Sequence, residues 1–273
     1  MRALRHPALW LGGVLTTLVV GTALLSLVWT PRPPAGIRVR DRLKPPFGEF
    51  LFGSDPFGRD VLSMLMAGAW NSLTIALAAV AIGLIGGVCL GLLAAARRGW
   101  TDEAVMRLSD FTFAFPAVLS AVMLSAAVGP GASTAVVAIG VFNIPVFARL
   151  TRAAALQVFA RDFVLAARAA GKGSLRIAAE HVLPNITGVL VVQATIQLAL
   201  AILAEAGLSY LGLGLQPPSP SWGKMLFESQ TYLDRAPWLA IFPGLAIAVA
   251  VLGLNLLGDG LRDLLDPRLR RAR

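Results

Sequence analysis

The chain has 273 residues, of which 56% are hydrophobic and only 14% are charged, with a mean hydropathy of +0.72 and a formal net charge of +9. Soluble domains carry about 25% charged residues, so this composition excludes an ordinary water-soluble domain and indicates one integral membrane domain. The basic residues are spread over short segments between apolar runs, which argues against a nucleic-acid partner.

The first charge-free run covers residues 8–29 and follows Arg2 and Arg5. A cleaved signal peptide is one interpretation, but the run is longer than a usual signal core and Thr30 is followed by a Pro-rich segment without a small-x-small cleavage site. We therefore expect a retained first membrane span. Residues 30–69 follow as an external segment, whose last part, 61–69, has helical apolar spacing and is expected to lie along the membrane surface.

Four further runs lack charge, at residues 73–96, 111–148, 186–204 and 236–258. A membrane-spanning helix needs about 20 apolar residues, so the run 111–148 is too long for one crossing. Gly129, Pro130 and Gly131 near its middle are a strong turn signal and divide it into two spans. Backbone groups in lipid must pair within their own segment, so the fold class is an all-α membrane bundle of six transmembrane helices.

Small residues mark the second span, where Gly87 and Gly91 have the Gly-x-x-x-Gly spacing that permits close helix packing. We favour packing within the chain over a seam between two chains. Cys89 lies between them and is the single cysteine, so an internal disulfide is excluded. We expect it to be a small buried hydrophobe.

The distribution of Lys and Arg predicts the topology. With the N-terminus inside, the inner segments carry 16 of these residues and the outer segments 8, in agreement with the positive-inside rule. Both termini are therefore expected in the cytoplasm. We divide the chain into 1–69 (N-terminal end, first span and external segment), 70–258 (a five-helix transmembrane domain) and 259–273 (a basic cytoplasmic tail).

Residues 207–235 form a long external loop that is expected to contain a short helix at 222–233. Long loops on one face of a compact domain often carry function.

No catalytic, nucleotide or metal motif is recognisable. A phosphate-binding loop reads G-x-x-x-x-G-K-[ST], and around Gly171 and Lys172 the pattern fails because Ala166 replaces the first glycine and Gly173 replaces the hydroxyl residue. No cluster of His, Cys, Asp and Glu has metal-site spacing. The chain is therefore expected to bind no cofactor and to be no enzyme.

Few polar side chains lie within the charge-free spans, and we name Asn143, Gln193, Gln197 and Asn255. They either form hydrogen bonds between helices, which we favour, or line a translocation path, for which Gln193 and Gln197 lie one turn apart on one helix face. Glu205, just beyond the fifth span at its outer end, is a further path candidate. An ion-coupled carrier usually needs a charge inside the membrane, so the uncharged spans argue against that class.

The basic loop at about 160–184 is the most informative segment. Residues 162–170 are strongly helix-forming, Gly171 is expected to end that helix, a second short helix is expected at 174–181, and Pro184 is expected to start the fifth span. This pattern predicts a rigid helix-turn-helix that a partner could bind. A merely solvated positive loop is the alternative.

The same loop resembles the Glu-Ala-Ala-x-x-x-Gly-x9-Ile-x-Leu-Pro signature of ABC importer permeases. Ala166, Ala167, Gly171, Leu183 and Pro184 match it, whereas Leu165 and His181 replace the Glu and the Ile. The version with Arg168 and His181 is similar to the C-type subunits of the dipeptide, oligopeptide and nickel branch. Three more segments agree with that branch, at 52–63, 205–223 and 255–267.

This resemblance implies a type I importer transmembrane domain in a bacterial inner membrane. It implies a heterodimer with a homologous permease, two ABC ATPase subunits that bind ATP and Mg²⁺, and an extracytoplasmic solute-binding protein. It also implies that the loop couples to an ATPase, through Asp162, Ala166, Ala167, Arg168, Gly171, Arg176, His181, Leu183 and Pro184. The solute would be a di- or oligopeptide or a related small molecule. A self-contained ion-coupled carrier or channel, and a membrane scaffold without transport activity, are the alternatives.

Overall fold

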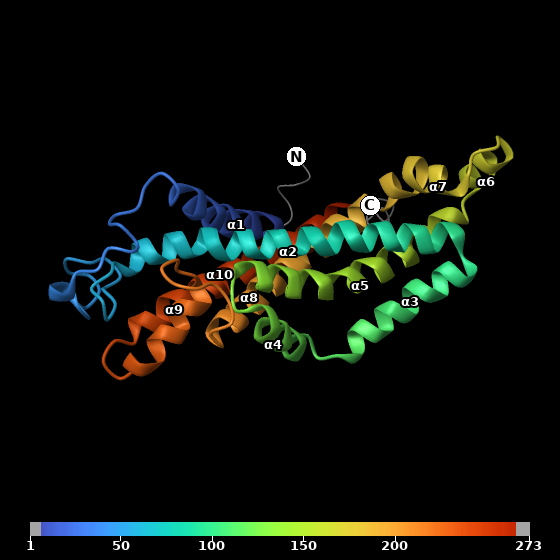
Figure 1. The fold of residues 1–273 in the computed structure, drawn as a ribbon. Helices are drawn as coiled ribbons and strands as arrows, with labels where there is room; N and C mark the ends of the chain where they lie inside the picture. The colour runs from blue at the N-terminus through green and yellow to red at the C-terminus, as the bar shows by residue number, and fades with distance from the viewer. Residues whose placement is uncertain (1–6, 266–273) are drawn as a thin grey trace.

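The computed structural model describes residues 7–265; Arg2, Arg5 and the tail residues 266–273 lie outside this range. The described chain is an elongated bundle of α-helices without a β-sheet (Figure 1). The helices are α1 (Pro7–Leu25), α2 (Val61–Arg97), α3 (Gly99–Ala114), α4 (Ala117–Val128), α5 (Ala132–Phe159), α6 (Asp162–Ala169), α7 (Ser174–Ile177), α8 (Leu183–Tyr210), α9 (Trp222–Ser229) and α10 (Trp238–Leu265). Five helical segments are long and apolar enough to cross a membrane, and the bent pair α3 and α4 makes a sixth.

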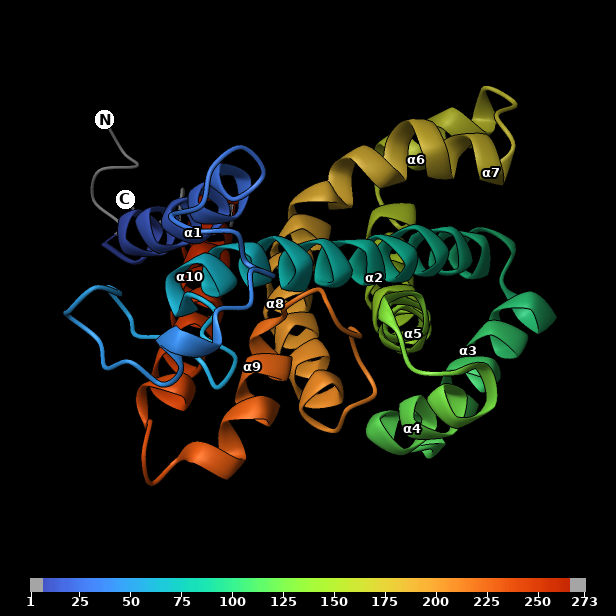
Figure 2. The ribbon, with the colours of Figure 1, turned by 60° about the vertical axis from the view of Figure 1, so that its left-hand side comes forward.

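The bundle has two distinct ends. α6 and α7 project from one end, called here the α6 end, and α9 with residues 30–60 lies at the other, called the α9 end (Figure 1). In Figure 2, α1 and α10 lie on one side of the bundle and α3 and α4 on the opposite side, with α2 and α5 between them.

The helix α2 corrects one expectation. Residues 61–69 do not lie along the membrane surface, because α2 is one continuous helix from Val61 to Arg97 that begins with Asp60 as its N-cap. Its first turns are buried, with Val61 0% and Met64 3% exposed. The indole of Trp222 on α9 donates a hydrogen bond to the Leu65 carbonyl and covers this part of α2. Burial by a segment distant in sequence therefore decides where these residues lie.

The seam between α2 and α5 forms the centre of the bundle and confirms that the glycine pattern serves packing within the chain. A Cβ atom at Gly87 would lie 2.5 Å from the Ile144 carbonyl oxygen, and one at Gly91 would lie 2.5 Å from that of Ala148. Neither position has room for a larger residue. Cys89, on another face of α2, is exposed in this chain, so the expectation of a buried cysteine was wrong.

The run 111–148 turns at Gly129, Pro130 and Gly131 as expected, since α4 ends at Val128 and α5 begins at Ala132. The span before this turn is not one straight helix. It consists of α3 and α4, bent by 83° at Phe115 and Pro116. A residue before proline is disfavoured in the α conformation, and Phe115 is extended with ψ 133°.

The fifth span also differs from its expected bounds. α7 is not a separate helix up to residue 181, because a π turn (Ala178–Val182) joins it to α8 without a break. Pro184 has no N–H for the residue 180 carbonyl, and the wider turn accommodates this loss with a bond from Leu183 N–H to the Ala178 carbonyl. At its other end α8 continues to Tyr210, so Glu205 lies within the helix.

The external segments pack at the α9 end. The short helix expected at 222–233 is α9 followed by a 3-10 turn, Gln230–Tyr232.

In the segment before α2, the Lys44 ammonium bridges Asp41 and Glu49 at 2.6 Å each. Hydrogen bonding to Lys44 holds the pKa of both carboxyl groups below the ordinary range, and bonding to Asp41 raises the pKa of Lys44.

Candidate functional site: the hairpin of α6 and α7

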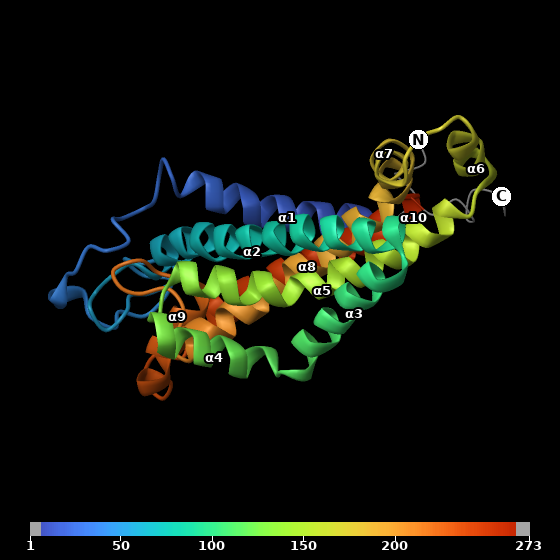
Figure 3. The same ribbon diagram turned by 45° about the vertical axis from the view of Figure 1, so that its right-hand side comes forward.

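The hairpin begins where α5 ends and projects from the bundle (Figure 3). α6 is closed at its C-terminus by Gly171, whose φ of +80° is the left-handed region that favours glycine. The Gly171 N–H donates to the Arg168 carbonyl at 2.9 Å, and the Lys172 N–H donates to the Ala167 carbonyl at 3.1 Å. This pair of bonds is the Schellman motif, so the prediction that Gly171 ends the helix is confirmed.

The hairpin is seated on a buried cluster at the α6 end of the bundle. Val164 of α6 and Ile177 of α7 are both 0% exposed and pack with Phe159 from α5, Ala95 from α2 and Val182 beside α8. Fully buried core residues pack densely and transmit displacement. The hairpin is therefore packed tightly against the ends of α2, α5 and α8.

Charged groups connect the second arm of the hairpin to the turn after α6. The Glu180 carboxylate accepts from Lys172 Nζ at 2.7 Å and from Arg176 Nε at 2.6 Å. His181 lies 3.1 Å from the same Lys172 Nζ, and its ring meets that of Phe163 edge to face. The Lys172, Arg176, Glu180 and His181 side chains thus form one connected group between the two arms.

Three large apolar side chains of the hairpin are exposed. Phe163, Leu165 and Leu175 are 47%, 53% and 50% exposed. Most of the predicted coupling residues are also exposed, namely Asp162, Ala166, Arg168, Gly171 and, on α8, Pro184. Ala167 and Leu183 are partly exposed. Large apolar side chains exposed beside charged residues, on a segment with a buried support, are typical of a protein-binding site.

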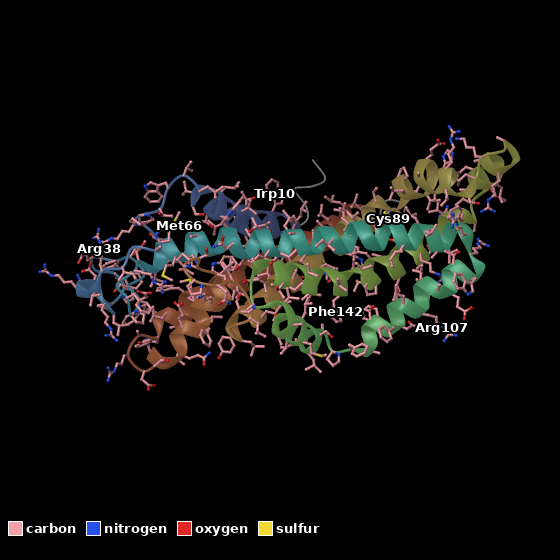
Figure 4. The ribbon with its side chains drawn as sticks, in the orientation of Figure 1. Trp10, Arg38, Met66, Cys89, Arg107 and Phe142 are labelled. Carbon is pink, nitrogen blue, oxygen red and sulfur yellow. The ribbon has the colours of Figure 1, made fainter. Side chains whose placement is uncertain are left out.

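The candidate path residues lie elsewhere, on α8. Gln197 is buried and Gln193 partly exposed, one turn apart as expected. Their face of α8 leads toward a cavity of about 260 Å³ lined by α4, α5 and α8, with Phe142, Asn143, Leu200, Ala201 and Ala204 among its residues. The labelled Phe142 lies between α5 and α4 in Figure 4. The amide of Asn143 donates to the Ile139 carbonyl of its own helix.

Glu205 is separate from this cavity. It is 0% exposed and accepts a hydrogen bond from the Ser209 hydroxyl at 2.7 Å. The fully buried Ser72 and Ser221 are its other polar neighbours, from α2 and from the N-cap of α9. The other carboxyl oxygen, Oε2, is buried with no hydrogen-bond partner in the described chain, and the group does not face an open surface in this conformation.

Two ion pairs were missed from the sequence. Arg152 of α5 binds both oxygens of Asp102 on α3, and Arg149 binds Asp110, with the Arg149 guanidinium 4.6 Å from the Phe113 ring centre. The signal was present, because Asp110 and Arg149 directly flank the charge-free run 111–148. Opposite charges at the two ends of a helical hairpin meet when it closes. Among residues 7–265 no group of three or more His, Cys, Asp or Glu could bind a metal ion.

The family described as "Binding-protein-dependent transport system inner membrane component" matches residues 87–271, which include the whole hairpin and all three path candidates. The chain belongs to this family. It is a multi-pass inner-membrane permease subunit of an ABC importer.

The relatives of this permease match over almost its full length. It is 45% identical to the di/tripeptide transport system permease protein DppC of Pseudomonas aeruginosa, over 96% of this chain and 89% of that one. It is 39% identical to the glutathione transport system permease protein GsiD of Pectobacterium atrosepticum, over 98% and 90% of the two chains. These matches confirm the resemblance recognised from the hairpin.

The fold of the permease is also found in a solved structure. The methionine ABC transporter MetNI, in inward-facing conformations, matches with a TM-score of 0.63 at 20% identity, over 74% of this chain and 96% of the other. The match confirms the type I importer fold.

Proposed function

We propose that this permease forms half of a translocation path for short peptides and couples it to a separate ATPase through the α6 and α7 hairpin. The observation that carries the coupling role is the combination of three exposed apolar side chains, on Phe163, Leu165 and Leu175, with a fully buried seat on three membrane helices. A partner that pushes on the hairpin would move α2, α5 and α8 together.

In this proposal the α6 end is cytoplasmic and both termini lie on that side. The excess of Lys and Arg on the inner segments supports this orientation. Two ATPase subunits bind ATP and Mg²⁺, a homologous permease supplies the other half of the path, and an extracytoplasmic solute-binding protein docks at the α9 end. Residues 70–258 form the transporting domain, and this chain itself hydrolyses no ATP.

Short peptides are the proposed solute because relatives over nearly the full length are named for di/tripeptide, peptide and glutathione transport. The path is proposed to follow the α8 face of Gln193 and Gln197, whose amides can donate to and accept from peptide groups. Glu205 is proposed to influence the path from its buried position at the α9 end.

The test is purification of the tagged permease from its own membrane under gentle conditions, with identification of the co-purifying chains by mass spectrometry. We expect a second permease and one or two P-loop ATPases. The isolated complex should import di- and tripeptides into liposomes only when ATP and the binding protein are present. Transport by this chain alone without ATP would contradict the proposal and favour a self-contained carrier.

Peptide selectivity has its own control. Deletion of the permease should abolish growth on a di- or tripeptide as the source of a required amino acid, and leave growth on the free amino acid unchanged. An equal loss of growth on the peptide and on the free amino acid would indicate a general membrane defect and contradict a peptide-specific role.

A further inference from the structure

The helices α3 and α4 are attached to the rest of the bundle by few buried side chains. Of the sixteen residues in α3, the buried ones are Val105 and Ser109. Of the twelve residues in α4, the buried ones are Ala121 and Ser125. In Figure 3, α3 extends obliquely from the end of α2 to α4. Because little apolar packing holds α3, its position depends on its polar contacts.

The ion pair of Asp102 and Arg152 is the first of these contacts. Arg152 of α5 donates to both carboxylate oxygens of Asp102, with Nη2 at 2.6 Å from Oδ2. The Asp102 and Arg152 side chains are 18% and 32% exposed, so solvent screens the pair only in part. A bidentate contact of this kind fixes orientation as well as distance. It therefore ties the first turn of α3, which contains Asp102, to α5.

A second contact holds α3 nearer its other end. Arg149 of α5 pairs with Asp110, and its guanidinium lies 4.6 Å from the centre of the Phe113 ring. The Arg149 and Asp110 side chains are 44% and 63% exposed, so this pair contributes less than the first. With two points of attachment, the orientation of α3 follows that of α5.

The part of α5 that carries Arg152 leads directly to the support of the hairpin. Arg152 lies seven residues before Phe159, which is about 10 Å along the helix. Phe159 packs with Val164 and Ile177 of the hairpin, and Ala155 belongs to the same buried cluster and is 0% exposed. A continuous packed route therefore connects the hairpin to Arg152.

The other end of α3 meets a break in the chain. The axes of α3 and α4 are bent by 83° at Phe115 and Pro116, which are both extended with ψ 133° and 124°. No backbone hydrogen bond among the described residues joins the two helices, and the first bond of α4 runs from Ser120 N–H to the Pro116 carbonyl at 3.0 Å. Hinges are formed by short segments of this kind at helix ends, where a few residues absorb the change in dihedral angle.

Beyond the break, α4 forms one wall of the cavity described above. Ala117, Val118 and Ala121 line it together with Phe142 of α5 and Leu200 of α8. A change of angle at the break would move this wall relative to α5 and α8. The cavity would therefore change its width.

We propose that Asp102 and Arg152 are positioning residues for transport. Their ion pair transmits a displacement of the hairpin and α5 to α3, and α4 then turns about Phe115 and Pro116 and changes the cavity. The inference rests on the proposed function, because it takes the hairpin as the place where the ATPase acts. It adds a link through charged side chains to the packed route along α5.

The test compares the amount of peptide imported per ATP hydrolysed by the reconstituted complex. Asp102→Ala and Arg152→Gln each remove one partner of the pair, and the double variant removes both. Co-purification with the ATPases in the wild-type ratio shows that each variant folds and assembles. We expect each single change to lower import per ATP by about fivefold or more, and the double variant to lose no more than the single ones. Such non-additive loss indicates two side chains that act as one link.

Glu103 and Arg107 provide a matched control on the same helix. They form an ion pair within α3, and their side chains are 63% and 77% exposed. Figure 4 labels Arg107 on α3. Glu103→Ala and Arg107→Gln make the same chemical changes close to Asp102 and should leave import per ATP unchanged.

Hydrogen exchange gives a direct report on the link. When ATP binds to the wild-type complex, protection should change both in the hairpin, at residues 162–170, and in α4, at residues 117–128. In Asp102→Ala the change should remain in the hairpin and be lost in α4.

Four results would overturn the inference. They are normal import per ATP in Asp102→Ala, additive losses in the double variant, an equal loss in the control variants, and an ATP-dependent change in α4 that persists in Asp102→Ala. Failure of Asp102→Ala and Arg152→Gln to assemble would also overturn it, because the pair would then only hold α3 in the fold. Failure of the proposed function is a different result, since the wild-type complex itself would then show no ATP-dependent import.

Discussion

Replacement of Gly171 tests the coupling role of the hairpin most directly. Gly171 has φ +80°, and a Cβ atom there would meet nothing within 4 Å, so Gly171→Ala adds no steric clash and changes only the backbone preference. An L-residue in the left-handed region costs about 1–2 kcal/mol. The closed hairpin should therefore lose about fivefold or more in stability relative to its opened forms, since 1.4 kcal/mol is a factor of about ten.

Gly171→Pro is the stronger change. Proline fixes φ near −65° and removes the N–H that bonds the Arg168 carbonyl, which together cost about 3 kcal/mol or more. We expect binding-protein-stimulated ATPase activity and peptide import to be lost, with membrane insertion unchanged. Gly171→Asn should be the mildest substitution, because asparagine tolerates the left-handed region.

The measurement is import by the reconstituted complex, with hydrogen exchange of residues 162–170 as a local report on the hairpin. Gly173→Ala is the matched control, because Gly173 has φ −70° and its Cβ would also meet nothing. Normal import by Gly171→Pro would refute the coupling role. Equal effects of alanine at positions 171 and 173 would refute the conformational argument.

Three further predictions concern other parts of the permease. Glu205→Gln should fold normally, because the amide oxygen can still accept the hydrogen bond from the Ser209 hydroxyl. Glu205→Leu should lower the free energy of unfolding by about 1–3 kcal/mol, because it leaves that buried hydroxyl without its partner. The loss should be seen as a lower melting temperature in detergent. Gly91→Leu should prevent folding, because its Cβ would lie 2.5 Å from the Ala148 carbonyl oxygen of α5. Gly13→Leu on α1 is the control and should be tolerated, because a Cβ atom there would meet nothing within 4 Å. The yields of purified protein are compared, and equal yields would contradict the packing argument. The Asp41 pKa is lowered and the Lys44 pKa raised by their mutual hydrogen bond, so this pair stabilises the external segment above the ordinary carboxyl pKa of 3.8 and below the ordinary lysine pKa of 10.5. Protease resistance of residues 30–60 should stay constant between about pH 5 and about pH 10 and fall outside that range, and a steady decline from pH 8 to pH 5 would disprove the assignment.

The local structure of the hairpin was largely predictable because its signals are local. The helix-forming residues before Gly171 and the need for a positive φ at its position concern neighbouring residues, so the end of α6 was predicted correctly. The glycines of α2 likewise indicated a close helix contact. The partner of that contact, α5, is not specified by a local pattern.

The differences arise where distant segments decide burial. Residues 61–69 have the apolar spacing of a surface helix, but Trp222 covers them and makes them the start of α2. Glu205 was placed outside its span because charge was used to mark the end of the helix. The carboxyl group is nevertheless buried, with one oxygen accepting from the Ser209 hydroxyl and the other, Oε2, without a hydrogen-bond partner in the described chain.

The amino-acid sequence alone determined that this protein is a helical membrane permease and which loop forms its hairpin, because hydrophobic run length, charge bias and glycine conformation act over a few residues. Only the tertiary structure decided that the third span is broken at Pro116 and how α3 is bound to α5. These properties depend on side chains brought together from opposite ends of the chain, and no local pattern contains that information.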